Sequence, residues 1–366
     1  MSWWSKLLSL PWVMMICAGL LVLTGALALY SASEGAWSPW AEQHLVRAGI
    51  GVVLMLVMGF LPLRWISRMA PLVLLAGILV LLALPFFGTG SGATRWINLG
   101  ALNLQPSEPI KVVLVLVLAK YFASRTWDQF DSLMTYLPAL FLIAVPVGLV
   151  LMQPDLGTAL MMGVGGLSML FLAGLPRRWI LLGLVAGLAS LPLAWSQLYD
   201  YQKARVLTFL NPGQDALGAG YQITQSKIAL GSGGLFGKGF LMGSQSQLDY
   251  LPEKQTDFVF TMIGEEFGLI GNLAVLLVYF VMMGSVLFVG IRCENRFGRL
   301  LCGGLSMMLF LYVFVNVAMV TGLMPVVGAP LPLISYGGTA MLTVFLALGL
   351  TMNVSLNLDK DDTEII

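Results

Sequence analysis

The sequence predicts an all-α fold, a polytopic transmembrane helical bundle of about ten spans. Two observations on composition carry this prediction: 58% of the 366 residues are hydrophobic, and only 10% are charged. A soluble domain usually has about 25% charged residues. Because water cannot solvate so much apolar side chain, lipid must be the solvent for most of the surface.

A third observation is the spacing of apolar runs, because a helix needs roughly 20 apolar residues to cross a bilayer. The candidate spans fall near 10–30, 45–62, 69–87, 108–123, 134–152, 157–174, 178–198, 258–291, 299–322 and 338–356. The eighth run is long enough to tilt or to project from the membrane. The total length suits one bundle, so we expect residues 1–366 to form a single domain.

Basic residues in alternate loops set the expected orientation. With ten spans, one side of the membrane holds Lys6, Arg64, Arg68, Lys120, Arg125, Arg177, Arg178, Arg292, Arg296 and Arg299. The positive-inside rule makes that side cytoplasmic, and both termini then lie in the cytoplasm. We expect a multi-pass protein of the bacterial inner membrane.

The other, extracytoplasmic side then holds the polar segments, which are 88–107, 153–157, the large loop 199–257 between spans seven and eight, and 323–337. Loops of more than about 15 residues are usually functional or disordered. Regularly spaced apolar residues in 199–257 favour order. Lysine and arginine (19) nearly balance aspartate and glutamate (18), which argues against a nucleic-acid partner.

Ionisable side chains at membrane depth are costly and are functional candidates by default. Glu108 and Lys111 are three residues apart, so they share a helix face, and a purely structural ion pair is the alternative. For Asp155 and Asp257, which stand just before apolar runs six and eight, the alternative is a helix N-cap. The adjacent carboxylates at 265 and 266 must face the bundle interior, because they cannot face lipid.

The outer loops also carry basic residues, namely Arg95, Lys203, Arg205, Lys227 and Lys238. They are either solvated loop charges or, as a group, an anion site such as one for a lipid pyrophosphate. The glycine-rich stretch 231–239 is not a P-loop, since Gly239 follows Lys238 where serine or threonine is needed. Flexible turns are the expectation for that stretch.

Several strings, in order along residues 20–355, resemble the SEDS family (shape, elongation, division and sporulation), and its rod-shape branch more than its division branch. They are Arg95-Trp96-Ile97-Asn98-Leu99-Gly100, Gln105-Pro106-Ser107-Glu108, Gln153-Pro154-Asp155-Leu156-Gly157-Thr158, Gly220-Tyr221-Gln222, Gln225-Ser226-Lys227-Ile228-Ala229, Leu251-Pro252-Glu253, Thr256-Asp257-Phe258 and Pro330-Leu331-Pro332-Leu333-Ile334-Ser335-Tyr336-Gly337-Gly338. The resemblance implies a peptidoglycan glycosyltransferase that polymerises lipid II, an undecaprenyl-pyrophosphate substrate, at the outer face of the inner membrane. It also implies a class B penicillin-binding protein and other elongation-complex membrane proteins as partners.

The resemblance places the essential carboxylate at Asp257, to which we assign the role of general base, with metal coordination as a competing role. Lys111 and Arg205 are the leading candidates to contact the pyrophosphate. The weaker candidates are Arg95, Lys227 and Lys238. Glu108 would orient Lys111, and Asp155 would shape the cavity or bind a divalent cation.

A Mg²⁺ or Mn²⁺ ion held between carboxylates and phosphate is chemically reasonable, and no organic cofactor is expected. Two other functions stay open, a lipid II flippase and a non-catalytic scaffold of the elongation machinery. The sequence shows no repeats with broken helices, which disfavours the flippase.

Overall fold

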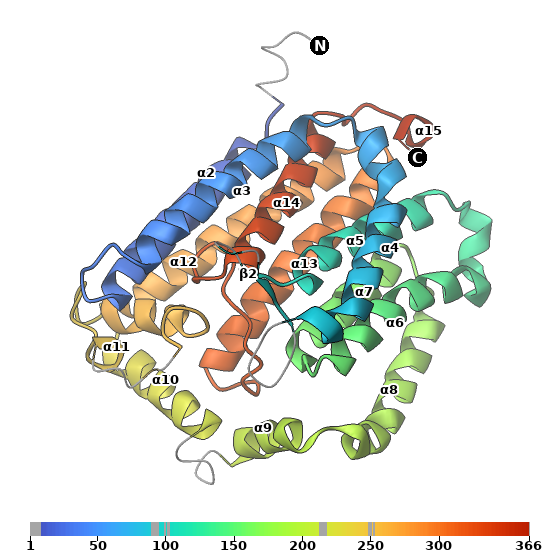
Figure 1. The fold of residues 1–366 in the computed structure, drawn as a ribbon. Coiled ribbons are helices and arrows are strands. Elements are labelled where there is room, and N and C mark those ends of the chain that lie inside the picture. Colours follow the sequence, from blue (N-terminus) through green and yellow to red (C-terminus); the bar gives the residue numbers. More distant parts are fainter. Residues whose placement is uncertain are drawn as a thin grey trace.

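The computed structural model describes residues 9–88, 95–98, 100, 103–211, 218–247, 251 and 253–365. Most helices lie side by side in a bundle, and the helical segment that begins at residue 177 curves around one end of it (Figure 1). The bundle helices are α2 (Trp12–Ala32), α3 (Trp40–Phe60), α4 (Leu63–Phe87), α5 (Ser107–Ala123), α6 (Leu137–Met152), α7 (Leu156–Leu172), α12 (Val259–Arg292), α13 (Arg296–Val320) and α14 (Gly338–Ser355).

Further elements complete the described chain. Helices α8 (Arg177–Gln197), α9 (Asp200–Leu210), α10 (Ala219–Gly233) and α11 (Ser244–Gln247) follow α7, and α15 (Asp362–Ile365) ends the chain. The 3-10 turns η1 (Trp127–Asp131) and η2 (Leu133–Thr135) precede α6. Strands β1 (Ile97–Asn98) and β2 (Asn103–Leu104) pair antiparallel, with Ile97 opposite Leu104.

Each predicted span falls on a helix, and the all-α membrane fold is confirmed. Among the described residues, seven helical segments are long and apolar enough to cross a bilayer, in α2, α3, α4, α6, α12, α13 and α14. Helices α5 and α7 have 17 residues each, and α8 has 21 but carries two arginines at its start. The count of ten spans therefore stays a prediction.

The eighth predicted span differs from expectation because α12 is broken. Gly268 has φ 68° and ψ −165°, a conformation outside the helical region that glycine adopts without steric cost. The break divides α12 into an N-terminal segment, residues 259–267, and a membrane-length segment, residues 269–292. The sequence analysis found no repeats with broken helices and did not predict this single break.

The core of the bundle is built around α13, α14 and α5, whose side chains are buried on most sides. Helix α14 lies close against α3. A Cβ on Gly349 would lie 2.7 Å from the carbonyl oxygen of Met55, so only glycine permits this backbone approach. This close packing fixes the positions of the helices that the polar loops connect.

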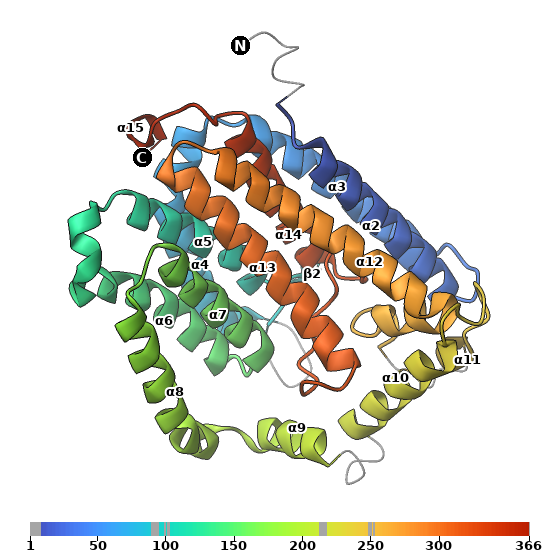
Figure 2. The same cartoon turned by 180° about the vertical axis from the view of Figure 1, so that it is seen from behind.

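Helices α8 and α9 lie apart from this core, as both views show (Figures 1 and 2), whereas α10 packs against α12 and buries Ile223 and Ala229. Helix α8 has no buried residue among those whose side chains are described. Loop 199–257, predicted to be ordered, is largely helical where it is described. Ser9 and the end of α14 meet, since the hydroxyl of Ser355 donates to Ser9 O at 2.5 Å, and α15 lies at the same end.

Candidate active site

Asp257 lies where the N-terminal segment of α12 meets the turn 323–337. Its side chain is half-buried, and its Oδ2 would lie 3.4 Å from a Cβ on Gly328. Gly328 has φ +73°, so both its conformation and the space beside it favour glycine. The alternative reading of Asp257 as an N-cap is wrong, because Phe258 holds the N-cap position of α12 and no side chain caps that helix.

Asn316 fixes the backbone at this point. Its Nδ2 donates to Asp257 O at 3.0 Å and to Ala329 O at 2.7 Å, while its side chain is fully buried in α13. Tyr336 N also donates to Gln255 O at 2.8 Å, which ties the same two segments together. The sequence analysis missed Asn316, although an amide within an apolar run was a signal for it.

The surroundings of Asp257 raise the pKa of its carboxyl from 3.8 to about 7. Burial is the largest cause, because it disfavours the charged form, and the neighbouring Glu253 carboxylate raises the pKa further. The Arg205 guanidinium lowers the pKa in opposition. A carboxyl with a pKa near neutrality is suited to accept a proton at physiological pH.

A second group of polar side chains surrounds a cleft of about 120 Å³ between the turn after α6, helix α9 and residues 324–327. Arg95, Asp155 and Arg205 all line it. Arg95 Nη1 lies 3.9 Å from Asp155 Oδ2, and its Nε donates to Gln153 O at 3.0 Å. The cleft thus brings together three residues that lie far apart in the sequence.

Asp155 is the N-cap of α7, as the alternative reading predicted. Its Oδ1 accepts from Thr158 N at 3.1 Å and its Oδ2 from Thr158 Oγ1 at 2.9 Å. Gln105 Nε2 also donates to Oδ2, at 3.1 Å. Both oxygens already accept hydrogen bonds, and the metal-ligand role of Asp155 stays a prediction.

Glu108 and Lys111 make the contact that their spacing predicts, at 2.7 Å. Tyr312 of α13 donates its hydroxyl to Glu108, and Lys111 Nζ lies 4.3 Å from the centre of the Tyr312 ring. Lys111 is only 3% exposed. The prediction that Lys111 contacts the pyrophosphate disagrees with this closed arrangement, in which burial keeps the ammonium from the surface.

Helix α13 connects this ion pair with Asp257. Tyr312 and Asn316 are four residues apart on α13, so they share one helix face about 6 Å apart along the axis. Tyr312 holds the ion pair, and Asn316 holds the backbone of Asp257. One face of one helix therefore positions both groups.

The remaining predicted cations lie in different surroundings. Lys238 Nζ contacts Glu265 Oε1 at 2.7 Å, so this charge is already neutralised and Lys238 does not fit a free anion site. Glu265 and Glu266 are both buried, as predicted. Lys227 is exposed beside Gly322, where a Cβ would come within 2.5 Å of the lysine Nζ.

The donors for a metal ion are sparse. Within the part of the chain that the structure describes, no group of three or more His, Cys, Asp or Glu side chains is placed to hold one. A divalent ion would therefore need phosphate oxygens of a substrate to complete its coordination.

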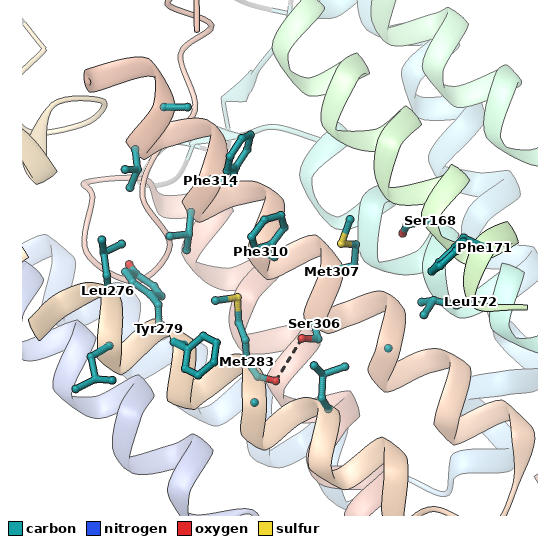
Figure 3. Close-up of a pocket in the computed structure, with 18 of the residues that line it drawn as sticks. Ser168, Phe171, Leu172, Leu276, Tyr279, Met283, Ser306, Met307, Phe310 and Phe314 are labelled. Carbon is teal, nitrogen blue, oxygen red and sulfur yellow. Dashed lines mark hydrogen bonds between the residues drawn. The ribbon is translucent and has the colours of Figure 1, made fainter. Parts of the chain in front are cut away.

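An apolar groove of about 890 Å³ runs along α7, α12 and α13 (Figure 3). Its walls include Phe171, Leu276, Phe310 and Phe314, and Ser306 is satisfied within the wall by its bond to Met283 O at 3.2 Å. The groove reaches Leu323, which adjoins Gly322 and hence Lys227. The sequence analysis did not predict this groove.

The fold is that of a polytopic membrane protein. Its ionisable groups gather at one end of the bundle, beside an apolar groove, which places a site near the membrane surface. The sequence matches the cell cycle protein family of FtsW, RodA and SpoVE over residues 6–360. The chain belongs to this family, which is the predicted SEDS family, and it is a multi-pass protein of the bacterial inner membrane.

Individual relatives cover nearly the whole chain. The peptidoglycan glycosyltransferase MrdB of Escherichia coli K12 is 43% identical over 355 residues, which are 96% of this chain and 95% of MrdB. A chain from a peptidoglycan synthase complex that coordinates polymerisation and crosslinking superposes with a TM-score of 0.82 at 31% identity, covering 96% of this chain and 98% of its own. The rod-shape-determining protein RodA of Thermus thermophilus superposes with a TM-score of 0.72 at 30% identity, with the same coverage.

Proposed function

We propose that this chain is a peptidoglycan glycosyltransferase that polymerises lipid II into glycan strands during cell elongation. The observation that carries the proposal is the carboxyl of Asp257, with a pKa raised to about 7, at the junction of apolar bundle and polar turns. The name of the E. coli relative, which is 43% identical over nearly the full length, supports the same activity.

The reaction joins the hydroxyl of an acceptor sugar to the anomeric carbon of a donor sugar that carries pyrophosphate. Asp257 accepts the hydroxyl proton as the oxygen attacks, and the carbon–oxygen bond to the pyrophosphate breaks with its electron pair leaving on the pyrophosphate. A single displacement converts the α-linked donor into a β-linked product. Arg205 and Arg95, which line the cleft beside Val326, would stabilise the negative charge on the leaving group.

The apolar groove suits the polyprenyl tail of this substrate. Its walls are almost wholly apolar, and its end near Leu323 lies beside the exposed ammonium of Lys227. A lipid with an anionic head and a long apolar tail needs this combination of surfaces. Lys227 therefore keeps the role of a head-group contact.

A Mg²⁺ or Mn²⁺ ion, if bound, would be held by Asp257 and by phosphate oxygens, and it would neutralise charge on the pyrophosphate.

We place the Asp257 end of the bundle outside the cell and both termini in the cytoplasm, since the basic loops gather at the opposite end. We assign a class B penicillin-binding protein as partner, which the similarity to a polymerising and crosslinking synthase complex supports.

Purified lipid II tests the polymerase. The detergent-solubilised protein, with and without its penicillin-binding partner, should form glycan chains, and Asp257→Ala should form none while remaining folded and membrane-bound. Chains of normal length from Asp257→Ala would remove the general-base assignment. If wild type makes no polymer in any mixture and does not move lipid II across liposome bilayers, the scaffold is the better function.

One observation favours the flippase as the second candidate. The break in α12 at Gly268 is the kind of interrupted helix that transporters use at their substrate sites. Liposomes that contain the protein and fluorescent lipid II distinguish the two functions. Movement of the lipid between leaflets without polymer formation would support the flippase and contradict the polymerase.

A further inference from the structure

The glycine-rich stretch 231–239, expected to be flexible, is docked on the break in α12. Gly234 O and Leu235 O accept from the amides of Leu269 and Ile270 at 2.9 and 3.2 Å. In return, Lys238 N and Gly239 N donate to the carbonyls of Glu265 and Glu266, both at 3.0 Å. The turn therefore satisfies the backbone groups that a helix break leaves without partners.

Glycine is required at the points of closest approach. A Cβ on Gly233 would lie 2.0 Å from Gly264 O, and one on Gly237 would lie 2.1 Å from Glu266 O. On the other side, a Cβ on Gly268 would lie 2.4 Å from Gly237 N. The glycines thus allow two backbones to pack directly, and the expectation of flexible turns for this stretch is wrong.

The docked turn presents an apolar tip. Leu235 is 61% exposed and Phe236 is 79% exposed, whereas the one charge of the turn, Lys238, is turned back onto Glu265. Behind the tip, Phe240 lies between Tyr30 and Phe267, with ring centres 6.3 and 6.1 Å away. In water, so exposed an apolar tip on a rigid base would be unfavourable.

The depth of Leu235 and Phe236 in the bilayer follows from the length of α12, to which the turn is hydrogen-bonded. Residues 269–292 span about 36 Å at 1.5 Å per residue, slightly more than the hydrocarbon core of about 30 Å. The segment carries no charge before Arg292, and outward side chains such as Leu269, Ile270 and Ile291 are about half or more exposed. Because Leu269 and Ile270 are bonded to the turn, Leu235 and Phe236 lie level with the edge of the hydrocarbon core.

We propose that residues 234–242 form an interfacial wedge, which inserts Leu235 and Phe236 into the lipid leaflet at this end of α12. Aromatic and large apolar side chains are favoured at the boundary between headgroups and acyl chains. The wedge is joined through residues 259–267 to Asp257, so lipid contact at the tip sets the depth of the carboxylate relative to the headgroups.

Spin labelling in liposomes tests the wedge. The native cysteines Cys17, Cys293 and Cys302 are all buried, so a nitroxide at Phe236→Cys reports from one place. Val281→Cys near the middle of α12 is the matched lipid reference, and Asn211→Cys at the exposed C-cap of α9 is the water reference. Accessibility to oxygen and to a water-soluble nickel chelate is measured for each label.

We expect the depth parameter at Phe236 to shift from the water reference towards the lipid reference, with low accessibility to nickel. Nickel accessibility equal to that at Asn211 would overturn the proposal. Protection that develops only when the penicillin-binding partner is added would also overturn it, because the tip would then be a protein-docking surface. Leu235→Cys provides a second site for the same measurement if Phe236→Cys does not fold.

Discussion

Asp257 and Lys111 are held by the same face of α13, yet their surroundings are opposite. Lys111 is sealed from solvent, with an ion pair to Glu108 and the Tyr312 ring against its ammonium. Asp257 is half-buried, is held through its backbone by Asn316, and has a carboxyl whose pKa is raised to about 7. The Lys111 charge is neutralised by its neighbours and therefore stabilises the structure. The charged form of Asp257 is disfavoured by burial, so its carboxylate readily accepts a proton.

Of the substitutions that test this contrast between Asp257 and Lys111, we expect the one at Asp257 to have the largest effect on activity. Asp257→Asn keeps the shape of the side chain but removes the base, so we expect glycan synthesis to fall by about 10²- to 10⁴-fold. The thermal unfolding temperature in detergent should not fall, since the wild-type carboxyl is destabilised by burial. A variant with normal turnover would place the base elsewhere.

Breaking the Glu108–Lys111 pair should act mainly on stability. Lys111→Met leaves the Glu108 carboxylate buried without its cation, a change that costs about 3–5 kcal/mol in buried pairs. Thermal unfolding of the detergent-solubilised protein measures this loss. The double variant Glu108→Leu with Lys111→Met is the matched control, because it removes both charges and should recover much of the stability.

If the double variant is stable but inactive, the ion pair has a role in the reaction, and the contrast with Asp257 fails. Recovery of both stability and glycan synthesis would establish the pair as structural. Steady-state kinetics with purified lipid II separates these outcomes.

Asn316 should give a smaller effect, on the rate more than on substrate binding. Asn316→Asp keeps the size of the side chain but replaces the Nδ2 donor, so Asp257 O and Ala329 O lose a shared partner. We expect kcat to fall about tenfold, as for a loss of about 1.4 kcal/mol, with KM nearly unchanged. An unchanged kcat in Asn316→Asp would show that the backbone of Asp257 needs no such restraint.

The pH profile should give the smallest effect and the most specific one. Below about pH 7 the Asp257 carboxyl becomes protonated and cannot accept a proton, so wild-type activity should fall as the pH is lowered. Glu253→Gln removes a carboxylate that raises this pKa, so the acid limb should shift to lower pH. Arg205→Gln should shift it to higher pH, because the guanidinium lowers the pKa.

Identical acid limbs in wild type, Glu253→Gln and Arg205→Gln would mean that another group controls the profile. The three proteins should be compared at saturating lipid II, so that altered binding does not disguise the shift. Asp257→Asn is the control, since its residual activity should lose the acid limb.

The local sequence pattern was sufficient to predict several features of the site. The three-residue spacing of Glu108 and Lys111 predicted their contact, and the position of Asp155 before an apolar run predicted its N-cap as an alternative. The same reasoning suggested an N-cap at Asp257 and was wrong, because the first helical turn of α12 begins after Phe258 and Asp257 turns towards Gly328. Local spacing fixes contacts within a helix but cannot report what a distant turn brings to it.

The sequence by itself determined the helical membrane fold, the positions of the apolar helices and the family, because apolar runs and ordered motifs are properties of the chain alone. Only the tertiary structure decided which charges are neutralised, as when Lys238 meets Glu265 from 27 residues away and Asn316 meets Asp257 from 59 residues away. It also decided that Gly268 breaks α12, since the partner for that break is a separate turn of the chain. The pKa of a carboxylate and the accessibility of an ammonium depend on burial and neighbouring charge, and both arise only when remote segments pack together.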